Sequence, residues 1–218
     1  SGLLSTKIGG PSVYPPQPDG IWDIPYSSEK WIPSEGEDRY RRGLYVFIRR
    51  SATYPSFMTF DATSREHTTV RRVRTNTPLQ ALVTLNDEAF FEAAQALAAR
   101  VLREAPSPRG ATSAREATSA REATSARGAT SARGATSAND ARAAYAFRLV
   151  ATRTPSAAEI ERVCTSFDKE LQRFRNDPAA AARMIKGREV QGIDPAEQAA
   201  WTIVANALLN LDETLSKE

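Results

Sequence analysis

Phe60–Asp87 reads FDATSREHTTVRRVRTNTPLQALVTLND, an arginine-dense stretch that leads directly into a strong helix start. Thr77 is the expected N-cap, and Pro78 fits the first helical position because its missing N–H is not needed there. Gln80 can reach back to the cap and complete a capping box. The pattern predicts a helix from Pro78 to about Leu85, with an apolar face formed by Leu79, Leu82, Val83 and Leu85.

Positive charge is concentrated upstream of that helix. The segment Arg39–Arg74 holds nine arginines against two carboxylates, Asp61 and Glu66, so its net charge is +7, whereas the whole chain carries +3. Such a stretch suits an anionic partner, which can be an acidic face of the same protein or an external polyanion. A basic stretch alone is a weak signal for nucleic acid, and no recognised nucleic-acid module is present, so we expect no nucleic-acid partner.

The arginines and the helix start together form a candidate anion-binding site. Free N–H groups and the positive end of the helix dipole add to the attraction of the guanidinium groups for a sulfate or a carboxylate. The candidate residues are Arg65, Arg71, Arg72, Arg74, Thr75, Asn76 and Thr77. An acidic side chain of the chain itself, from Asp61, Glu66 or Asp87, can fill the same role, and both alternatives stay open.

Asp61 and Glu66 are also the first carboxylates to test for an enzyme that acts on glycans. Paired carboxylates can serve as general acid and as base or nucleophile, but their separation in space decides this. Salt bridges to Arg65, Arg71 or Arg72 compete with that role. No catalytic residue is therefore assigned from the sequence.

Cys164 is the only cysteine and His67 the only histidine. A Cys/His zinc site would lack ligands, no disulfide can form within the chain, and no haem-attachment motif is present, so we expect no metal and no cofactor in this chain. Cys164 lies on an apolar helical stripe, which favours a small buried hydrophobe over a reactive thiol.

The first 38 residues are dominated by prolines and glycines, which predicts an irregular, partly polyproline II segment. Aromatic residues are interleaved with the prolines, and they either pin this long loop onto a core or form a platform that stacks on sugar or peptide. These residues are Tyr14, Trp22, Tyr26 and Trp31. Leu44–Ile48 favours a short buried strand, with helix as the alternative. Val70 and Val73 alternate weakly with arginines, as in an edge strand or an extended loop.

Further helices follow from apolar spacing and capping signals. They are expected from Glu88 to about Glu104, from Asp140 to about Thr152, after the Ser156/Glu159 capping box, from Pro178 to near Gly187, and after Asp194-Pro195. We therefore predict a mainly α, helical-bundle-like domain with an irregular Pro/Gly-rich N-terminal segment and one or two short strands.

A hexapeptide of the ATSAR type repeats five times between Gly110 and Asn139. Alanine is the only apolar residue in each unit, so the tract cannot bury enough surface to offset its ordering entropy. This predicts a low-complexity linker at 110–139 between an N-terminal part, 1–109, and a C-terminal helical part, 140–218, which packs on the first.

Several stretches together resemble the planctomycete C-terminal domain of unknown function. They are GGPSVYPPQPDGIW (9–22), DRYRRGLYVFIRR (38–50), FDATSRE (60–66), RRVRTNTPLQALVTLND (71–87), YAFRLVATRTPSAAE (145–159) and AAWTIVANALLNLDE (199–213). The resemblance covers nearly the whole chain except the repeat, and this chain resembles the final part of that domain. In that family the domain follows a cytochrome c domain and a second planctomycete-specific domain.

The resemblance implies what kind of protein this chain is part of and where that protein is located, but it assigns no role to any residue. It implies a larger exported protein with covalent haem c elsewhere in the parent chain, an extracytoplasmic location, and an association with degradation of sulfated polysaccharides. The chain itself has no run of 18 apolar residues and no signal-peptide pattern at its start. We expect a non-catalytic interaction or scaffold module that contacts other domains of its parent protein and an anionic polysaccharide. The alternative is a part of a glycan-degrading enzyme.

Overall fold

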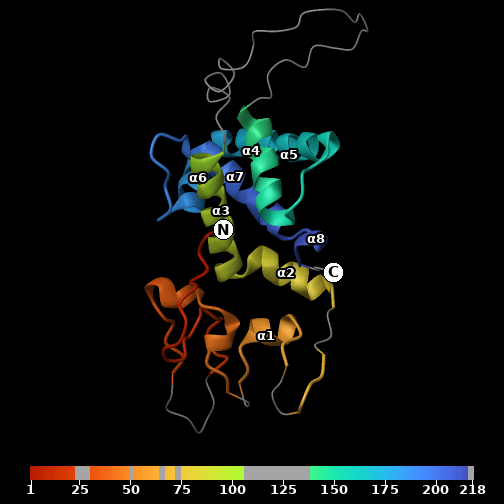
Figure 1. Cartoon of the computed structure of the whole chain (residues 1–218). Coiled ribbons are helices and arrows are strands. Elements are labelled where there is room, and N and C mark those ends of the chain that lie inside the picture. Colours follow the sequence, from red (N-terminus) through yellow and green to blue (C-terminus); the bar gives the residue numbers. More distant parts are fainter. Residues whose placement is uncertain (23–29, 50–51, 64–66, 72–74, 106–137, 216–218) are drawn as a thin grey trace, which may run out of the picture. The chain divides into compact units, whose positions relative to one another are not determined.

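The computed structural model describes residues 1–22, 30–49, 52–63, 67–71, 75–105 and 138–215. Within these ranges the chain is mainly helical, with isolated β-bridges in place of strands (Figure 1). The residues form two compact units. Unit 1 holds Ser1–Leu97 and Ala205–Glu218, and unit 2 holds Ala98–Val204. The mainly helical fold and the irregular N-terminal segment predicted from the sequence are confirmed.

The N-terminal part of unit 1 consists of loops and short turns of helix. Its elements are the 3-10 helices η1 (Gly36–Tyr40) and η2 (Gly43–Tyr45) and the helix α1 (Pro55–Thr59), coloured red to orange in Figure 1. Single parallel bridges join Ser5 to Arg41 and Val13 to Val46. The start of the chain is thus fixed to a neighbouring segment by a few backbone hydrogen bonds.

The strand predicted for Leu44–Ile48 is wrong. The run begins in η2, where the Val46 N–H donates to the Gly43 carbonyl at 3.2 Å. In the described part of the chain, Val13 alone forms a β-bridge with this segment: its N–H donates to Tyr45 O at 2.8 Å and its carbonyl accepts from Phe47 N at 2.9 Å. Leu44 is exposed, so the apolar run is not the interior of a sheet. Val70 is also exposed and lies in no strand, and Val73 lies outside the described residues.

Aromatic side chains anchor the proline-rich loop. Tyr14 stacks on Phe47 with ring centroids 5.3 Å apart, and Trp31 stacks on Tyr54 at 6.0 Å. Trp31 also donates its indole N–H to Pro15 O at 2.8 Å, and the Tyr54 hydroxyl donates to Pro16 O at 3.0 Å. Proline carbonyls accept hydrogen bonds although proline nitrogens cannot donate them. Tyr14 and Trp31 therefore anchor the loop on its neighbours, which was the first of the two alternatives for the aromatic residues. Tyr26 lies outside the described residues.

The remaining elements of unit 1 are helical. Helix α2 (Pro78–Asn86) begins with the capping box predicted from the sequence, since the Thr77 side chain accepts from Gln80 N and the Gln80 side chain accepts from Thr77 N. Helix α3 (Glu88–Glu104) follows directly, and α8 (Asp212–Leu215) is a short addition that the sequence did not predict. Helices α3 and α7 each contribute residues to both units.

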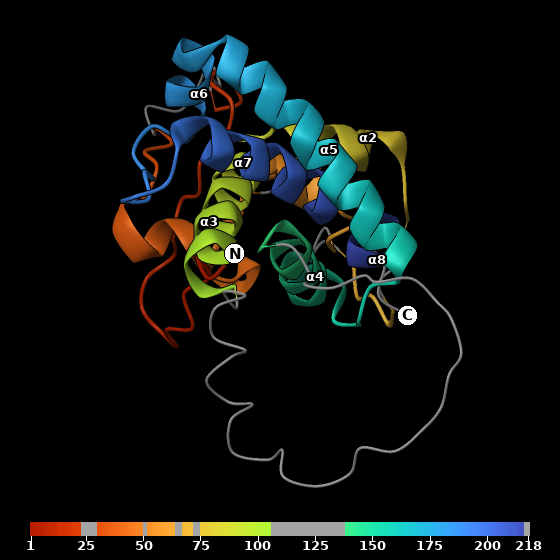
Figure 2. The same cartoon turned by 90° about the horizontal axis from the view of Figure 1, so that it is seen from above.

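Unit 2 is built from α4 (Ala138–Ala151), α5 (Ala157–Asn176), α6 (Pro178–Ile185) and the first part of α7 (Pro195–Leu209). Helices α5 and α7 lie side by side in Figure 2. Between them Phe167 stacks on Trp201, with ring centroids 4.8 Å apart. Both side chains are fully buried. The inward-facing stripes predicted for α5 and α7 are confirmed at these two residues.

Acid is expected to weaken the start of α5. The Arg153 guanidinium, together with the Ser156 backbone N–H, holds the pKa of Glu159 at about 2, below its ordinary value of 4.5. A carboxylate with a lowered pKa stabilises the fold at pH above 4.5, and this contribution is lost as pH falls toward 2. We therefore expect Glu159→Gln to lower the melting temperature at neutral pH, with a difference from wild type that shrinks between pH 4.5 and pH 2. A difference that stays constant over this range would contradict the assignment.

The two helices that flank the repeat are joined within unit 2. The Tyr145 hydroxyl of α4 donates to Glu104 Oε2 of α3 at 2.7 Å, and Glu104 also accepts from Arg100 Nε at 2.9 Å. Helix α4 begins at Ala138, so the last two residues of the fifth repeat unit, Ala138 and Asn139, are helical. Residues 110–137 of the repeat lie outside the described residues, and the division of the chain at 110 and 139 stays a prediction.

Removal of residues 110–137 is expected to leave the fold intact. The tract carries no side chain suited to core packing, and the cost of closing a segment depends only weakly on its length, about 0.6 kcal/mol for each doubling. Chemical denaturation of the deletion variant should therefore remain cooperative, with the free energy of unfolding within about 1 kcal/mol of wild type. Loss of a cooperative transition would show that the tract belongs to the core.

None of the helices in the described residues combines the length and the apolar composition that crossing a membrane requires.

Candidate functional site

The first turn of α2 is the centre of a polar cluster. The Asp61 carboxylate accepts from Thr75 N at 3.1 Å and from the Thr75 hydroxyl at 2.6 Å. The Gln80 side-chain amide donates to Thr59 O and Thr75 Oγ1, both at 2.9 Å, and to Asp61 at 3.4 Å. Asp61 has a φ of 53°, in the left-handed region that Asp tolerates better than most residues. An acidic side chain from within the chain thus contacts the Thr75 backbone.

The structure describes part of the predicted anion site. Asn76 donates its amide to Asp212 Oδ1, and the Thr77 N–H is used by Gln80 Oε1 at 3.2 Å. Arg71 is exposed. The other candidates, Arg65, Glu66, Arg72 and Arg74, lie outside the described residues. Binding of an external anion at this site stays a prediction, and at Thr75 it would compete with Asp61.

The buried side of α2 is polar. Gln80 is only 3% exposed and Thr84 is equally enclosed. The single proton of the Thr84 hydroxyl can be donated to the Gln80 carbonyl, the Ala81 carbonyl or Asn210 Oδ1, which all lie within hydrogen-bond distance. Asn206 donates to Leu85 O at 3.1 Å. The helix thus packs through amides and hydroxyls, most of which are paired, although the Asn206 side-chain oxygen has no hydrogen-bond partner among the described residues.

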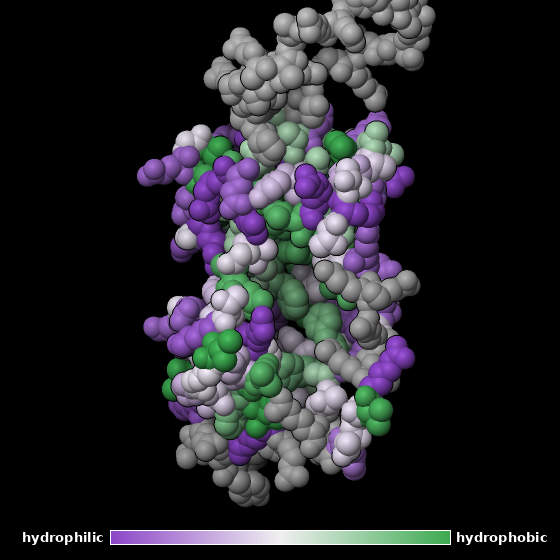
Figure 3. Space-filling view, in the orientation of Figure 1, coloured by the Kyte–Doolittle hydropathy of each residue, from purple (hydrophilic) through white to green (hydrophobic). Residues whose placement is uncertain are grey.

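The apolar face of α2 points away from this packing. Leu79 is 57% exposed and Leu82 is 58% exposed, and Leu85 is also exposed. The sequence correctly predicts an apolar stripe here, but the stripe covers no core within the described residues. Figure 3 shows other hydrophobic residues on the visible surface of the part that Figure 1 colours red to yellow. We call Leu79, Leu82 and Leu85 the leucine face.

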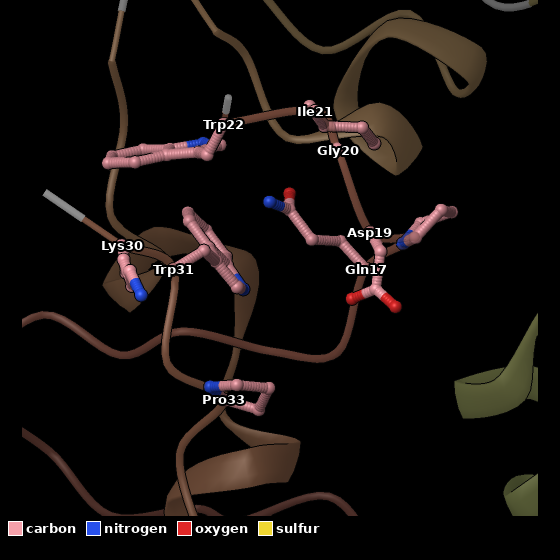
Figure 4. Close-up of a pocket in the computed structure, with 9 residues that line it drawn as sticks. Gln17, Asp19, Gly20, Ile21, Trp22, Lys30, Trp31 and Pro33 are labelled. Carbon is pink, nitrogen blue, oxygen red and sulfur yellow. The ribbon is translucent and has the colours of Figure 1, made fainter. Parts of the chain in front are cut away.

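A pocket of about 270 Å³ lies beside the aromatic cluster of unit 1 (Figure 4). Its walls come from the proline-rich loop and from the segment that carries Trp31. The rings of Trp22 and Trp31 lie 5.2 Å apart, inclined by 59°, and Arg49 lies 4.9 Å from the centre of the Trp22 ring. Gln17, Asp19 and Lys30 add an amide, a carboxylate and an ammonium group to the lining. We call this the tryptophan pocket.

Two buried polar atoms at the tryptophan pocket have no hydrogen-bond partner among the described residues. They are the indole nitrogen of Trp22 and the side-chain oxygen of Gln17. A buried donor or acceptor without a partner costs about 1–3 kcal/mol relative to the paired state. In Figure 4 the Gln17 amide points toward the segment that carries Ile21 and Trp22. Both residues line the pocket, but these two atoms have almost no accessible surface.

The model of the PSD1 family, protein of unknown function (DUF1553), matches residues 1–167, which is more than half of the chain. The chain belongs to the PSD1 family. This confirms the family resemblance seen in the sequence, although the match ends within α5, and the stretch 199–213 lies beyond it. PSD1 is a domain of larger proteins. No curated protein and no solved structure matches the chain.

Several cations of the PSD1 arginine stretch are paired inside unit 1. Arg39 binds both Glu92 oxygens, at 3.1 and 2.9 Å, and also reaches Glu88. Arg41 is buried, donates to Lys7 O and Gly9 O, and stacks 3.8 Å from the centre of the Tyr45 ring. Arg39 and Arg41 thus find their partners within the chain itself, as one of the two alternatives for the arginine stretch predicts.

Cys164 of this PSD1 chain is a half-buried thiol that donates to Asp140 Oδ1 at 3.3 Å. Burial, with the Asp140 carboxylate beside it, raises the pKa of the thiol to about 12. A thiol that stays protonated at neutral pH is a poor nucleophile. Within the described ranges, no three His, Cys, Asp or Glu residues come together as metal ligands.

Some of the residues described above have a signal in the PSD1 sequence and others have none. Gln80 is identifiable as a capping residue, but its contact with Thr59 O is a tertiary one. Gln17 has no local signature in the sequence, since it is a glutamine between two prolines. Only the folded loop brings it to the same pocket as Trp22 and Trp31.

Proposed function

We propose that this PSD1 domain is a non-catalytic interaction module that docks on other domains of the larger protein to which it belongs. The observation that carries the proposal is the leucine face of α2. A helix that buries glutamine and threonine and exposes three leucines has the inverse of the usual arrangement of a surface helix. Contact with another folded domain would remove this apolar surface from water.

The distribution of apolar side chains over the chain supports docking through unit 1. Among the described residues, every exposed large hydrophobic side chain belongs to that unit. They are Leu4, Ile8, Ile32, Leu44, Met58, Val70, Leu79, Leu82, Leu85 and Leu211. Single exposed hydrophobic residues are common on protein surfaces, but three on successive turns of one helix form a contiguous strip. Unit 1 is therefore the unit that we expect to contact the partner domain.

The contacts of Asp61 favour an interaction module over a glycan-degrading enzyme. Its carboxylate receives hydrogen bonds from Thr75 and Gln80, which fix it to the fold. Such contacts hold the side chain in one place. Glu66, the second carboxylate considered, lies outside the described residues.

The setting of the module follows from the family resemblance. We propose an extracytoplasmic parent protein that carries haem c in another domain. Contact with an anionic polysaccharide would involve the exposed cations of the arginine stretch. Arg42 and Arg71 are exposed on unit 1 and offer guanidinium groups of the kind that bind sulfate in pairs of hydrogen bonds.

The exchange Leu82→Gln tests the docking proposal. In the 218-residue chain the side chain is exposed, so the free energy of unfolding should change by less than about 0.5 kcal/mol. In the full-length parent protein the exchange should weaken docking by about 1.5–3 kcal/mol, the value of burying one leucine. Thermal denaturation of both proteins measures the difference.

A matched control is Lys169→Gln, which changes an exposed residue of α5 in unit 2. This variant should leave the thermal stability of both proteins unchanged. A benzophenone amino acid at position 82 should also crosslink, in the parent protein, to a domain other than this one. If Leu82→Gln changes the thermal stability of the isolated chain and of the parent protein by the same amount, docking through α2 is disproved.

A further inference from the structure

We propose that the partner on the leucine face of α2 presents an apolar surface bordered by lysine or arginine side chains. This proposal rests on the docking proposed in the preceding section, and it adds the chemistry of the partner. Its basis is the presence of carboxylates at both ends of the leucine face in unit 1. These charges are an observation separate from the exposure of the leucines themselves.

The leucine face leads into a pocket at the C-terminal end of α2. Leu79 and Leu82 are three residues apart, and Asn86 follows four residues after Leu82, so the three share one side of the helix. Asn86 lines a pocket of about 340 Å³, whose other walls come from residues 16–19 of the proline-rich loop and from the residues directly after α2. A partner that covers the leucines therefore also meets this pocket, which we call the carboxylate pocket.

The lining of the carboxylate pocket is negative. It contains Asp19, Asp87 and Glu88, and the described lining residues include no lysine or arginine. Arg39 reaches Glu88 from outside the lining, but the same guanidinium also binds Glu92. One positive charge is thus shared by two carboxylates, while Asp19 and Asp87 add further negative charge. The pocket therefore favours a cationic group of the partner.

Carboxylates also lie at the opposite end of the leucine face. Just before the N-cap of α2, Asp61 accepts from the Thr75 N–H at 3.1 Å, and Asp212 accepts from the Asn76 amide. The exposed Arg71 precedes these residues in the sequence, so the excess of negative charge is larger at the carboxylate pocket. The apolar strip thus runs between two regions of unit 1 that carry carboxylates.

This charge pattern disfavours a second copy of the chain as the occupant. Protein interfaces combine an apolar centre with a polar rim, and like charges that face each other across the rim are unfavourable. Two α2 helices packed on each other, in either direction, would bring carboxylates next to carboxylates. Lysine or arginine around an apolar centre would instead form ion pairs at the same places. We therefore assign the leucine face to a basic surface of another domain of the parent protein.

The test is charge reversal in the full-length parent protein. Asp19 is an exposed residue of the carboxylate pocket, so Asp19→Lys replaces an attraction by a repulsion. At about 0.01 M salt the exchange should lower the melting temperature of the parent protein by about 2–4 °C. At about 1 M salt the difference should largely vanish, because the charges are screened. The melting temperature of the isolated 218-residue chain should not fall.

Matched variants separate charge from local structure. Asp19→Asn suits the same turn and removes only the charge, so it should show about half the loss of Asp19→Lys, and it covers the case that lysine disturbs the loop. Asp19→Glu keeps the carboxylate and should retain the wild-type melting temperature of the parent protein. Asp168→Lys reverses an exposed charge on α5 in unit 2 and should have no effect specific to the parent protein.

The outcomes separate this proposal from the docking proposal. If Leu82→Gln destabilises the parent protein but Asp19→Lys and Asp19→Asn do not, docking stands and the basic partner is overturned. If Leu82→Gln has no effect specific to the parent protein, both proposals fail. Sedimentation of the parent protein supplies the remaining comparison, since a dimer that Leu82→Gln dissociates would assign the leucine face to a second copy and overturn the basic partner.

Discussion

Replacement of Phe167 by alanine is expected to lower the free energy of unfolding of unit 2 by about 3–5 kcal/mol, the usual cost of emptying a large aromatic site in a core. Phe167 is 1% exposed, as is Trp201, and their stacked rings lie 4.8 Å apart between α5 and α7. Alanine would remove the ring and leave a cavity against Trp201. Denaturation in urea, followed by the fluorescence of Trp201, measures the loss.

The control for this experiment lies on the same helix. Ser166→Ala changes an exposed neighbour and should alter the free energy of unfolding by less than about 0.5 kcal/mol. The loss in free energy of unfolding for Phe167→Leu should lie between those for Phe167→Ala and Ser166→Ala, since leucine keeps much of the apolar volume. A loss below about 1 kcal/mol for Phe167→Ala would mean that the site collapses around the cavity or that α5 faces another way.

Gln80→Ala should lower the free energy of unfolding by about 2–4 kcal/mol, because it removes a buried amide that forms hydrogen bonds with several groups at once. The variant leaves Thr59 O without its donor and Thr77 N without its acceptor, and it removes one donor to Asp61. The same denaturation experiment measures the loss. Gln172→Ala on α5 is an exposed helical glutamine and supplies the matched control. Equal stability of the two variants would show that the polar packing of α2 contributes nothing.

Helix starts were the features that the sequence predicted best. The boxes Thr77/Gln80 and Ser156/Glu159 both form as expected, and the proline after Asp177 begins α6. These signals are local, since a cap and its partner are three residues apart and satisfy backbone groups that every helix start leaves unpaired. Such features need no knowledge of the tertiary structure.

The direction in which a helix faces could not be predicted in the same way. Periodicity shows that α2 has an apolar stripe, but its buried side is set by polar contacts with Thr59 and with Asn210, a residue 126 positions away from Thr84. The strand error at Leu44–Ile48 has a similar origin, because composition favours a ladder only where a partner strand exists. The candidate arginines and the tryptophan pocket likewise depend on which distant segments meet.

The junction between Glu104 and Tyr145 has a consequence for how the gene can change. Each hexapeptide unit is encoded by a whole number of codons, so replication slippage that gains or loses one unit keeps the reading frame. The helices on either side are held by their own hydrogen bond, and we expect that the flanking fold does not depend on how many units separate them. Alleles of this gene that differ in repeat number are therefore expected to encode domains of equal stability, which lets the tract drift in length under little selection from folding.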